Sequence, residues 1–305
     1  MLKKTILLLV LLVTLSCSHE GAENTPEANG LVTEESPITT NAQIEFLEEL
    51  QAFNDSYEKV IDRDDRMPNT RGFWSAVGDV LVVAGADVMG AGGGAKAVQA
   101  IAAGVGVATG GTGYAIVTGV AAGIAGAGSS IAAGRALRAI SDQNMRPCYS
   151  GLSIHYPSEY VDLEYAGRLH NTLISDMLSP GLRSTYSPSA VESELLSNEY
   201  FMKTSEQIAE IISVNIHETN GILKTLDDLE KQGFINKDQH MVFSFFFDIY
   251  NESKKLKHIE DIVNYYISAI AKTEVLNDSD KVVLISAFSV ASQSPSFWIQ
   301  DGRAQ

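Results

Sequence analysis

The sequence predicts an all-α protein in which a Gly/Ala-rich helical hairpin is followed by an α-helical bundle domain. The hairpin is predicted from residues 97–134, which contain no charged side chain and include 10 glycines and 12 alanines. The bundle is predicted from the chain after Glu159, where apolar residues recur at spacings of three and four. No run of alternating apolar and polar residues lies between hairpin-turn signals, so no strand is expected.

Residues 1–16 have the pattern of an export signal. Lys3 and Lys4 precede an apolar run at 6–13, which is too short for a membrane span of about 20 residues. Ser16 and Cys17 follow, and this ending resembles the signal peptides of bacterial lipoproteins, in which cleavage precedes a cysteine that becomes lipidated. The resemblance implies a lipid on Cys17 and an exported, membrane-anchored protein of the cell envelope, at the outer membrane or cell surface. An ordinary secretory peptide is the alternative.

The charge balance limits the classes of partner. The chain has a net charge of −16, and loss of residues 1–16, with two lysines and no acidic residue, would change it to −18. Nucleic acid and anionic lipid are therefore not expected as electrostatic partners. The membrane, reached through the lipid and through the Gly/Ala-rich segment, a protein partner and a second copy of the chain remain as candidates. With Cys17 acylated, only Cys148 is left, so no intramolecular disulfide is expected.

Residues 17–42 are polar and acidic and contain two prolines, a composition typical of a flexible tether. Residues 43–75 are expected to hold an amphipathic helix and a linker. An apolar stripe at three- and four-residue spacing, with glutamates between its members, indicates the helix. The stripe consists of Ile44, Leu47, Leu50, Phe53, Tyr57 and Val60 or Ile61, and only Phe46 lies beside it.

Residues 76–140 form the Gly/Ala-rich region, in which two or three short helices are expected to fold against each other. Its first part carries Asp79, Asp87 and Lys96, and we expect the glycines at 92–94 to break it, because glycine costs about 1 kcal/mol relative to alanine inside a helix. The glycines at 110–113 predict a turn before a last helix at 114–140. Small residues spaced by four would let helix backbones approach closely. The candidates for helix packing or membrane contact are Gly104, Gly106, Gly110, Gly119 and Gly123.

Residues 141–158 are expected to be a linker, and residues 159–305 an α-helical bundle domain long enough to form its own core. Period-3.6 patterning predicts helices at 161–178, 204–218, 222–232, 238–254, 258–272 and 278–292. Thr204 to Gln207 has the capping-box pattern for the second of these helices, and Asn277 precedes the last. The phenylalanine-rich stretch 243–247 covers more than one helix face, which predicts burial at the bundle centre.

Two short strings carry a family resemblance. Residues 70–74 (TRGFW) and 165–171 (YAGRLHN) resemble sequences of a group of uncharacterised lipoproteins of the Bacteroidetes type. The resemblance implies export and lipid attachment and carries no activity. The Gly/Ala-rich segment by itself resembles the membrane-inserting segments of bacteriocins.

His170 and Asn171, in the second string, are the candidate local functional residues, with a structural histidine as the default role. No catalytic residue, metal site or cofactor is predicted. The glycines at 104–110 come near a dinucleotide fingerprint, but the spacing is one residue too long and no strand–turn–helix context surrounds it. His217 and Glu218 lack the second histidine of the zinc-protease pattern, and no serine stands in Gly-x-Ser-x-Gly.

Two accounts of function remain open. In the first, the hairpin packs on itself and on the helix at 44–61, and the protein is a lipid-anchored helical binding or scaffold module. In the second, the protein is a membrane-active, bacteriocin-like toxin that inserts its Gly/Ala-rich segment. The nine Val and Ile residues of 97–134 supply only about −3 to −5 kcal/mol of insertion free energy, and the segment has no Leu, which favours the first account. An enzyme acting on envelope polymers is a third class that rests on location alone.

Overall fold

The computed structural model describes residues 41–65, 73–104, 112–136, 151–178, 190–216, 218, 220–253 and 255–299. These residues contain ten α-helices, one short 3-10 helix and no strand, so the all-α prediction is confirmed. The described residues from Asn41 onward belong to one compact unit. The predicted signal peptide, Cys17 and the tether up to Thr40 lie outside the described residues.

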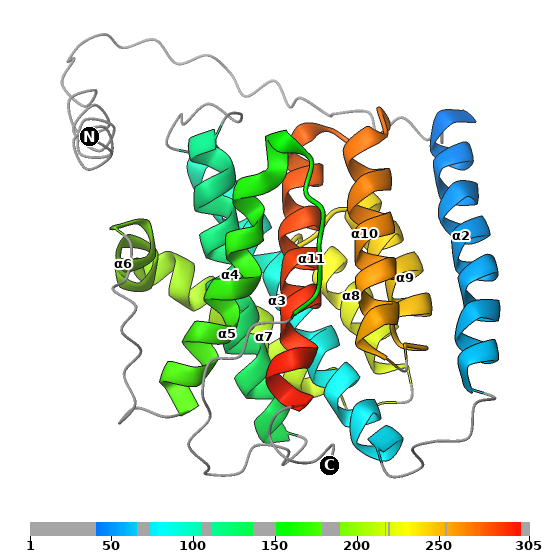
Figure 1. Cartoon of the computed structure of the whole chain (residues 1–305). Helices are drawn as coiled ribbons and strands as arrows, with labels where there is room; N and C mark the ends of the chain where they lie inside the picture. Colours follow the sequence, from blue (N-terminus) through cyan, green and yellow to red (C-terminus); the bar gives the residue numbers. More distant parts are fainter. Residues whose placement is uncertain are drawn as a thin grey trace, which may run out of the picture. The chain divides into compact units, whose positions relative to one another are not determined.

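The later helical predictions correspond to α5 and to α7–α11 with shifted ends, whereas the short α6 was not predicted. In chain order (Figure 1) the helices are α2 (Asn41–Asp65), α3 (Phe73–Gly104), α4 (Thr112–Ala136), the 3-10 helix η1 (Ser158–Leu163), α5 (Glu164–Leu178), α6 (Ala190–Ser197), α7 (Glu199–Asn215), α8 (Gly221–Lys231), α9 (Lys237–Tyr250), α10 (Leu256–Lys272) and α11 (Asp278–Ile299).

The helices α3 and α4 pack against each other and form a helical hairpin. Gly90 and Gly94 of α3 face α4. A Cβ atom at Gly90 would overlap the side chain of Ser129, and one at Gly94 would overlap the Cβ of Ala125. The missing side chains therefore allow the two backbones to approach closely.

The glycines at 92–94 do not break α3, so that expectation is wrong, and the helix is continuous over 32 residues. Successive residues of an α-helix point about 100° apart, so three adjacent glycines face three different directions. A Cβ at Gly92 would lie 2.7 Å from Cζ of Phe243 on α9, and one at Gly93 would lie 3.0 Å from Cδ1 of Ile208 on α7. The third glycine faces α4. Close packing on all three sides outweighs the low helix propensity of glycine.

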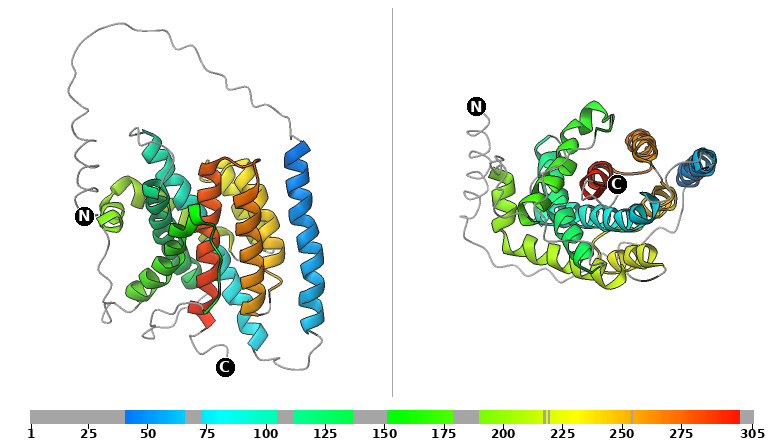
Figure 2. Two further views of the ribbon diagram at one scale, coloured as in Figure 1. Left: turned by 45° about the horizontal axis from the view of Figure 1, so that its top comes forward. Right: turned by 60° about the horizontal axis from the view of Figure 1, so that its bottom comes forward.

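The hairpin lies within the helical bundle. In addition to their mutual contact, α3 packs against α7, α8 and α11, and α4 packs against α5, α7 and α11. Figure 2 shows α3, in cyan, running between the later helices. Gly119 and Gly123 of α4 face the η1–α5 segment, and a Cβ at Gly123 would lie 2.9 Å from the carbonyl oxygen of Ala166 and 3.1 Å from Cβ of Leu169. The later helices therefore cover the Gly/Ala-rich helices.

Aromatic side chains fill the core between α9, α10 and α11. Phe246 stacks on Phe288 with ring centroids 4.2 Å apart and meets Tyr266 edge-on at 5.3 Å. Phe243 meets the same Phe288 edge-on at 5.9 Å. These four rings are fully buried, and the burial predicted for the phenylalanine-rich stretch holds except at the half-buried Phe245.

The helix α2 packs against α9 and α10, and not against the hairpin as one account expected. Its buried face is rotated from the predicted stripe: Phe46 is buried, whereas Ile44 is 45% exposed. The rotation buries Asn54, whose Nδ2 donates to the carbonyl oxygen of Phe245 at 2.8 Å and whose Oδ1 accepts from the Tyr266 hydroxyl at 2.9 Å. A hydrogen-bonded asparagine therefore contributes to the orientation of this helix, which an apolar stripe alone does not predict.

The capping box predicted at Thr204 is also wrong. Thr204 lies inside α7, where its hydroxyl donates to the carbonyl oxygen of Tyr200 at 2.8 Å, and the helix begins after Asn198, whose Oδ1 accepts from the backbone of Phe201. A capping box is found instead at the start of α9, between Asn236 and Gln239. Threonine hydroxyls bond to the preceding turn as readily as they cap a helix, so the pattern is ambiguous in sequence.

Candidate functional site

Asp87 lies in α3, among small and apolar residues, and is fully buried. A buried carboxylate is costly unless neighbouring groups donate hydrogen bonds or carry the opposite charge. Helices α5 and α11 supply such groups at this point. The site is therefore built around a buried carboxylate that α3 places inside the bundle.

His170 and Asn171 of α5, the candidates from the sequence, lie beside Asp87 and are fully buried. Nε2 of His170 is 3.2 Å from Oδ2 of Asp87, an ion-pair distance without hydrogen-bond alignment. Nδ1 of His170 is 2.9 Å from Oδ1 of Asn171, and Nδ2 of Asn171 donates to the carbonyl oxygen of Gln293 at 3.0 Å. Because that amide orientation presents an oxygen to the ring, Nδ1 must be the donor. Ion pairing with Asp87 then requires a second proton on Nε2.

Two residues of α11 complete the surroundings of the carboxylate. The hydroxyl of Ser294 donates to Oδ2 of Asp87, and Nε1 of Trp298 donates to the same atom at 3.4 Å. Ser294 and Trp298 are four residues apart and so share one helix face. Burial raises the pKa of the Tyr250 hydroxyl on α9 well above its usual value, and the negative charge of Asp87 raises it further.

Helix α4 reaches the same place without contributing a side chain. A Cβ at Gly126 would lie 3.1 Å from the carbonyl oxygen of Asp87 and 3.1 Å from Cδ2 of His170. Glycine at this position allows α4 to approach both groups. The Asp87 cluster, defined as Asp87, His170, Asn171, Ser294 and Trp298, therefore joins α3, α5 and α11, with α4 packed against it.

The Asp87 cluster is enclosed, because its members are all buried. In this conformation none of these side chains can contact a dissolved substrate. Their interactions are hydrogen bonds and a charge contact inside the bundle. Loss of one partner from a buried ion pair costs about 3–5 kcal/mol. The cluster is thus placed to hold the hairpin to the helices around it.

A second polar contact joins α3 to α11. Nζ of Lys96 is 3.8 Å from Oδ1 of Asp280, which is 2% exposed. The same Oδ1 accepts from Nδ2 of Asn236 and from Nε2 of Gln239, each at 2.8 Å. Lys96 therefore pairs with a carboxylate that the α9 capping box already holds in place.

The remaining site candidates are spread along the hairpin or lie outside it. Gly119 and Gly123 face α5, as described above. Gly104 is the last residue of α3, and Cys17, Gly106 and Gly110 lie outside the described residues. Among the residues that the structure describes, no group of three or more His, Cys, Asp or Glu side chains is placed to hold a metal ion.

Sequence reasoning missed the roles of Asp87, Ser294 and Trp298. A signal for Asp87 was available, because a lone carboxylate in a long apolar helix requires a buried partner or an exposed position. No comparable signal marks Ser294, which is one of many serines on a helix that reads as an ordinary core segment.

Comparisons with protein-family models, with curated proteins and with solved structures find no match to this chain. The resemblances seen in the sequence therefore stay predictions, and function must be argued from the residues themselves.

Proposed function

We propose that the protein is a lipid-anchored helical binding or scaffold module of the cell envelope, exported and held to the membrane through Cys17. The observation that carries the proposal is the burial of the apolar hairpin. Val80–Ile101 and Gly113–Arg135 are long and apolar enough to cross a membrane by length and composition, yet 83% and 78% of their most apolar windows are buried among the other helices. Core helices of many proteins share these properties, so the hairpin requires no bilayer to cover it.

The same two stretches favour a second candidate function, insertion of the hairpin into a membrane. Their length matches the roughly 20 residues that a span needs. Insertion would have to separate α3 from α5 and α11 and so break the contact between Asp87 and His170. That contact opposes release, which is why the module is the first proposal.

The anchoring proposal is tested by fractionating cells that express the full chain or its Cys17→Ala variant. The module predicts that the wild type partitions with membranes and needs detergent for release, whereas the variant is released without detergent. Mass spectrometry of the wild type should find acyl chains on Cys17. An unmodified Cys17, or a variant that still requires detergent, contradicts this proposal.

The two candidate functions are separated by enlarging one glycine at the α4–α5 contact. Gly123→Leu should abolish cooperative unfolding of the module, because a Cβ alone already lies 2.9 Å from a backbone oxygen. Gly128→Leu is the matched control, since a Cβ there meets nothing within 4 Å. Both changes make α4 more apolar, so insertion predicts greater dye release from liposomes for both variants. The module predicts no release by wild type or control.

A further inference from the structure

The two apolar stretches of the hairpin differ in the charges that they carry. Gly113–Arg135 of α4 has a charged residue only at its end, whereas Val80–Ile101 of α3 contains Asp87 and Lys96. Charged side chains near the middle of a span are among those that a bilayer accepts least. Lys96 is nearer the end of its stretch, and its long side chain can reach the interface. Asp87 is nearer the middle and has a short side chain, so it is the main obstacle to insertion of α3.

Inside the folded protein the same carboxylate is stabilised by groups from outside the hairpin. The Ser294 hydroxyl and the Trp298 indole of α11 donate to Oδ2 of Asp87. Nε2 of His170 on α5 is 3.2 Å from that oxygen. An inserted hairpin would lose all three contacts, because α5 and α11 are not part of it. Asp87 therefore favours the bundle and opposes the bilayer at the same time.

Other polar contacts of the hairpin are a smaller obstacle to insertion. Gln99 of α3 donates to the carbonyl oxygen of Ser279 at 2.9 Å, and the Tyr114 hydroxyl of α4 is 3.1 Å from Oγ of Ser279. Gln99 and Tyr114 lie within two residues of the end of their stretches, so a hairpin across a bilayer would place them at the interface, where tyrosine is enriched. Ser129 donates to the carbonyl oxygen of Ala125 inside α4 and would keep this bond. These contacts oppose insertion less than those of the buried carboxylate.

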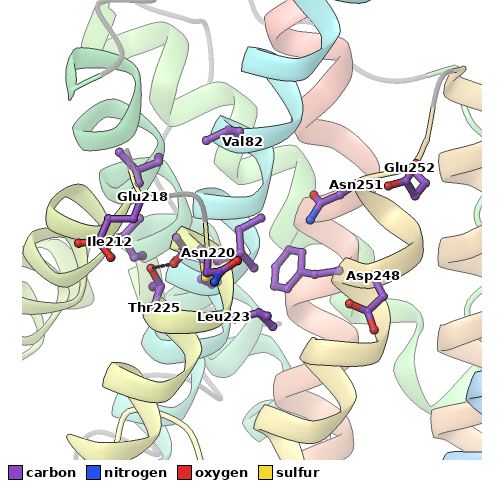
Figure 3. A pocket seen from close by; sticks show the side chains of 14 residues that line it. Val82, Ile212, Glu218, Asn220, Leu223, Thr225, Asp248, Asn251 and Glu252 are labelled. Carbon is purple, nitrogen blue, oxygen red and sulfur yellow. Dashed lines mark hydrogen bonds between the residues drawn. The ribbon is translucent and has the colours of Figure 1, made fainter.

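The apolar packing of the hairpin divides into contacts within it and contacts with other helices. Gly90 and Gly94 face α4, so the close packing of α3 on α4 can persist when the hairpin leaves the bundle. On another side of α3, a cavity of about 490 Å³ lies between α3, the turn from α7 to α8, and α9, and its lining includes Val82 and Met89 (Figure 3). Side chains that face a cavity lose dispersion contacts. This side therefore contributes less to the attachment of α3, which leaves more of it to the Asp87 cluster.

We propose that the Asp87 cluster is an autoinhibitory contact, which keeps the α3–α4 hairpin in the bundle and out of a lipid bilayer. Loss of the charge on Asp87 removes the charge contact with His170 and also makes α3 easier to place in lipid, so the hairpin inserts. The inference rests on the proposed function, because the binding or scaffold module is the closed state and the inserted hairpin is the open state.

The test compares two variants that both break the contact between Asp87 and His170 but differ in charge. Asp87→Asn keeps the size of the side chain and removes its charge, whereas His170→Leu leaves the carboxylate in α3. Each is made in the full chain with Cys17→Ala and is added to phosphatidylcholine liposomes that contain a self-quenched dye. We expect Asp87→Asn to release dye about tenfold faster than the parent Cys17→Ala chain, and His170→Leu about threefold faster at most, although it is destabilised too. Asp162→Asn, which removes the charge of an exposed η1 residue, is the matched control and should behave as the parent.

Hydrogen exchange measured with the same liposomes shows which helices enter the lipid. In Asp87→Asn the amides of α3 and α4 should stay protected while those of α5 and α11 exchange faster, a pattern that loss of folding alone does not produce. Equal release by Asp87→Asn and His170→Leu, or equal exchange in all four helices, would overturn the inference.

Failure of this inference is distinguished from failure of the proposed function. Because Cys17→Ala is present throughout, the result does not depend on lipid anchoring. Release by the parent chain would contradict the module and the autoinhibitory contact together, whereas absence of release by Asp87→Asn would contradict the autoinhibitory contact alone.

Discussion

Helices α3 and α2 are both long, and they are held in the protein by opposite means. Between Val80 and Gln99, α3 is buried except at the half-buried Val82 and Lys96, and its glycines touch α4, α7 and α9 because they have no side chains. In contrast, α2 contacts α9 and α10 with one face, and its contacts come from large rings such as Phe53, stacked on Tyr265 with centroids 3.7 Å apart. The packing of α3 therefore depends on glycines that have no side chain, whereas the packing of α2 depends on large aromatic side chains.

The two helices also differ in how they carry charge. On α3, Asp87 is fully buried and paired with His170. On α2, the charged residues lie mostly on the exposed face, and Asp64 pairs with Lys255 and His258 at its edge. Helix α3 therefore belongs to the core of the fold, whereas we expect α2 to separate locally without unfolding the rest.

The largest expected effect is at the buried charge of α3. Asp87→Ala leaves Ser294 and Trp298 without their common acceptor and removes the carboxylate beside His170, so it should lower the free energy of unfolding by about 3–5 kcal/mol. Chemical denaturation of the full chain with Cys17→Ala measures this. Asp162→Ala, at an exposed residue of η1, is the control and should change it by less than about 0.5 kcal/mol.

A double variant shows whether the pair with His170 causes the loss. His170→Leu removes the imidazole that Asp87→Ala leaves without its neighbouring carboxylate, so the two changes together should cost less than the sum of the single changes. Strict additivity would mean that Asp87 and His170 are not coupled. The difference in charge pairing between α3 and α2 would then not contribute to how the two helices are held.

The next effect uses one substitution at two glycines of the hairpin. Gly94→Ala places a Cβ against that of Ala125 and should destabilise the protein by about 1–3 kcal/mol. Gly128→Ala meets nothing within 4 Å and should stabilise it by up to about 1 kcal/mol through helix propensity. Thermal unfolding measures both changes. If both changes stabilise the protein, helix propensity and not close packing governs the hairpin.

Much of the fold follows from the sequence because amphipathic periodicity shows which face of a helix is buried. It does not identify the helices that pack against that face. The ranges of α8 and α10 were predicted closely, since each has one apolar face. The continuity of α3 through 92–94 could not be predicted. Propensity argues against glycine in a helix, and only the positions of Phe243 and Ile208 on distant helices reverse that argument.

The candidate site was predicted in part, for a related reason. His170 and Asn171 were named from a short string, and the structure adds their partners on α3 and α11. Asp87 was noted as a charge in an apolar segment, but its partner depends on which face of α5 meets α3. Such a pairing depends on how the helices pack, which the residue pattern of a single helix does not specify.

A smaller effect is expected from loss of a ring on α2. Phe53→Ala removes the stack on Tyr265 and should destabilise the docking of α2 by about 1–2 kcal/mol. Hydrogen exchange should then be faster at the amides of α2 and unchanged at those of α3. Glu58→Gln, on the exposed face of α2, is the control. Equal acceleration in both helices would show that α2 and α3 unfold together, against the comparison.

The smallest effect concerns the charge pair at the end of α2. Hydrogen bonds from Lys255 and His258 lower the pKa of Asp64 below its ordinary value of 3.8. A folded-state pKa below the unfolded one means that the contribution to stability is present above pH 4 and is lost as the pH falls through the folded-state value. Asp64→Asn should therefore lower the melting temperature slightly at pH 6, and this difference should shrink as the pH is lowered below 4. The matched control is Asp62→Asn, at an exposed neighbour, for which no such pH-dependent difference is expected. An Asp64→Asn difference that persists at low pH would mean that the asparagine disturbs packing, and that charge adds nothing to the docking of α2.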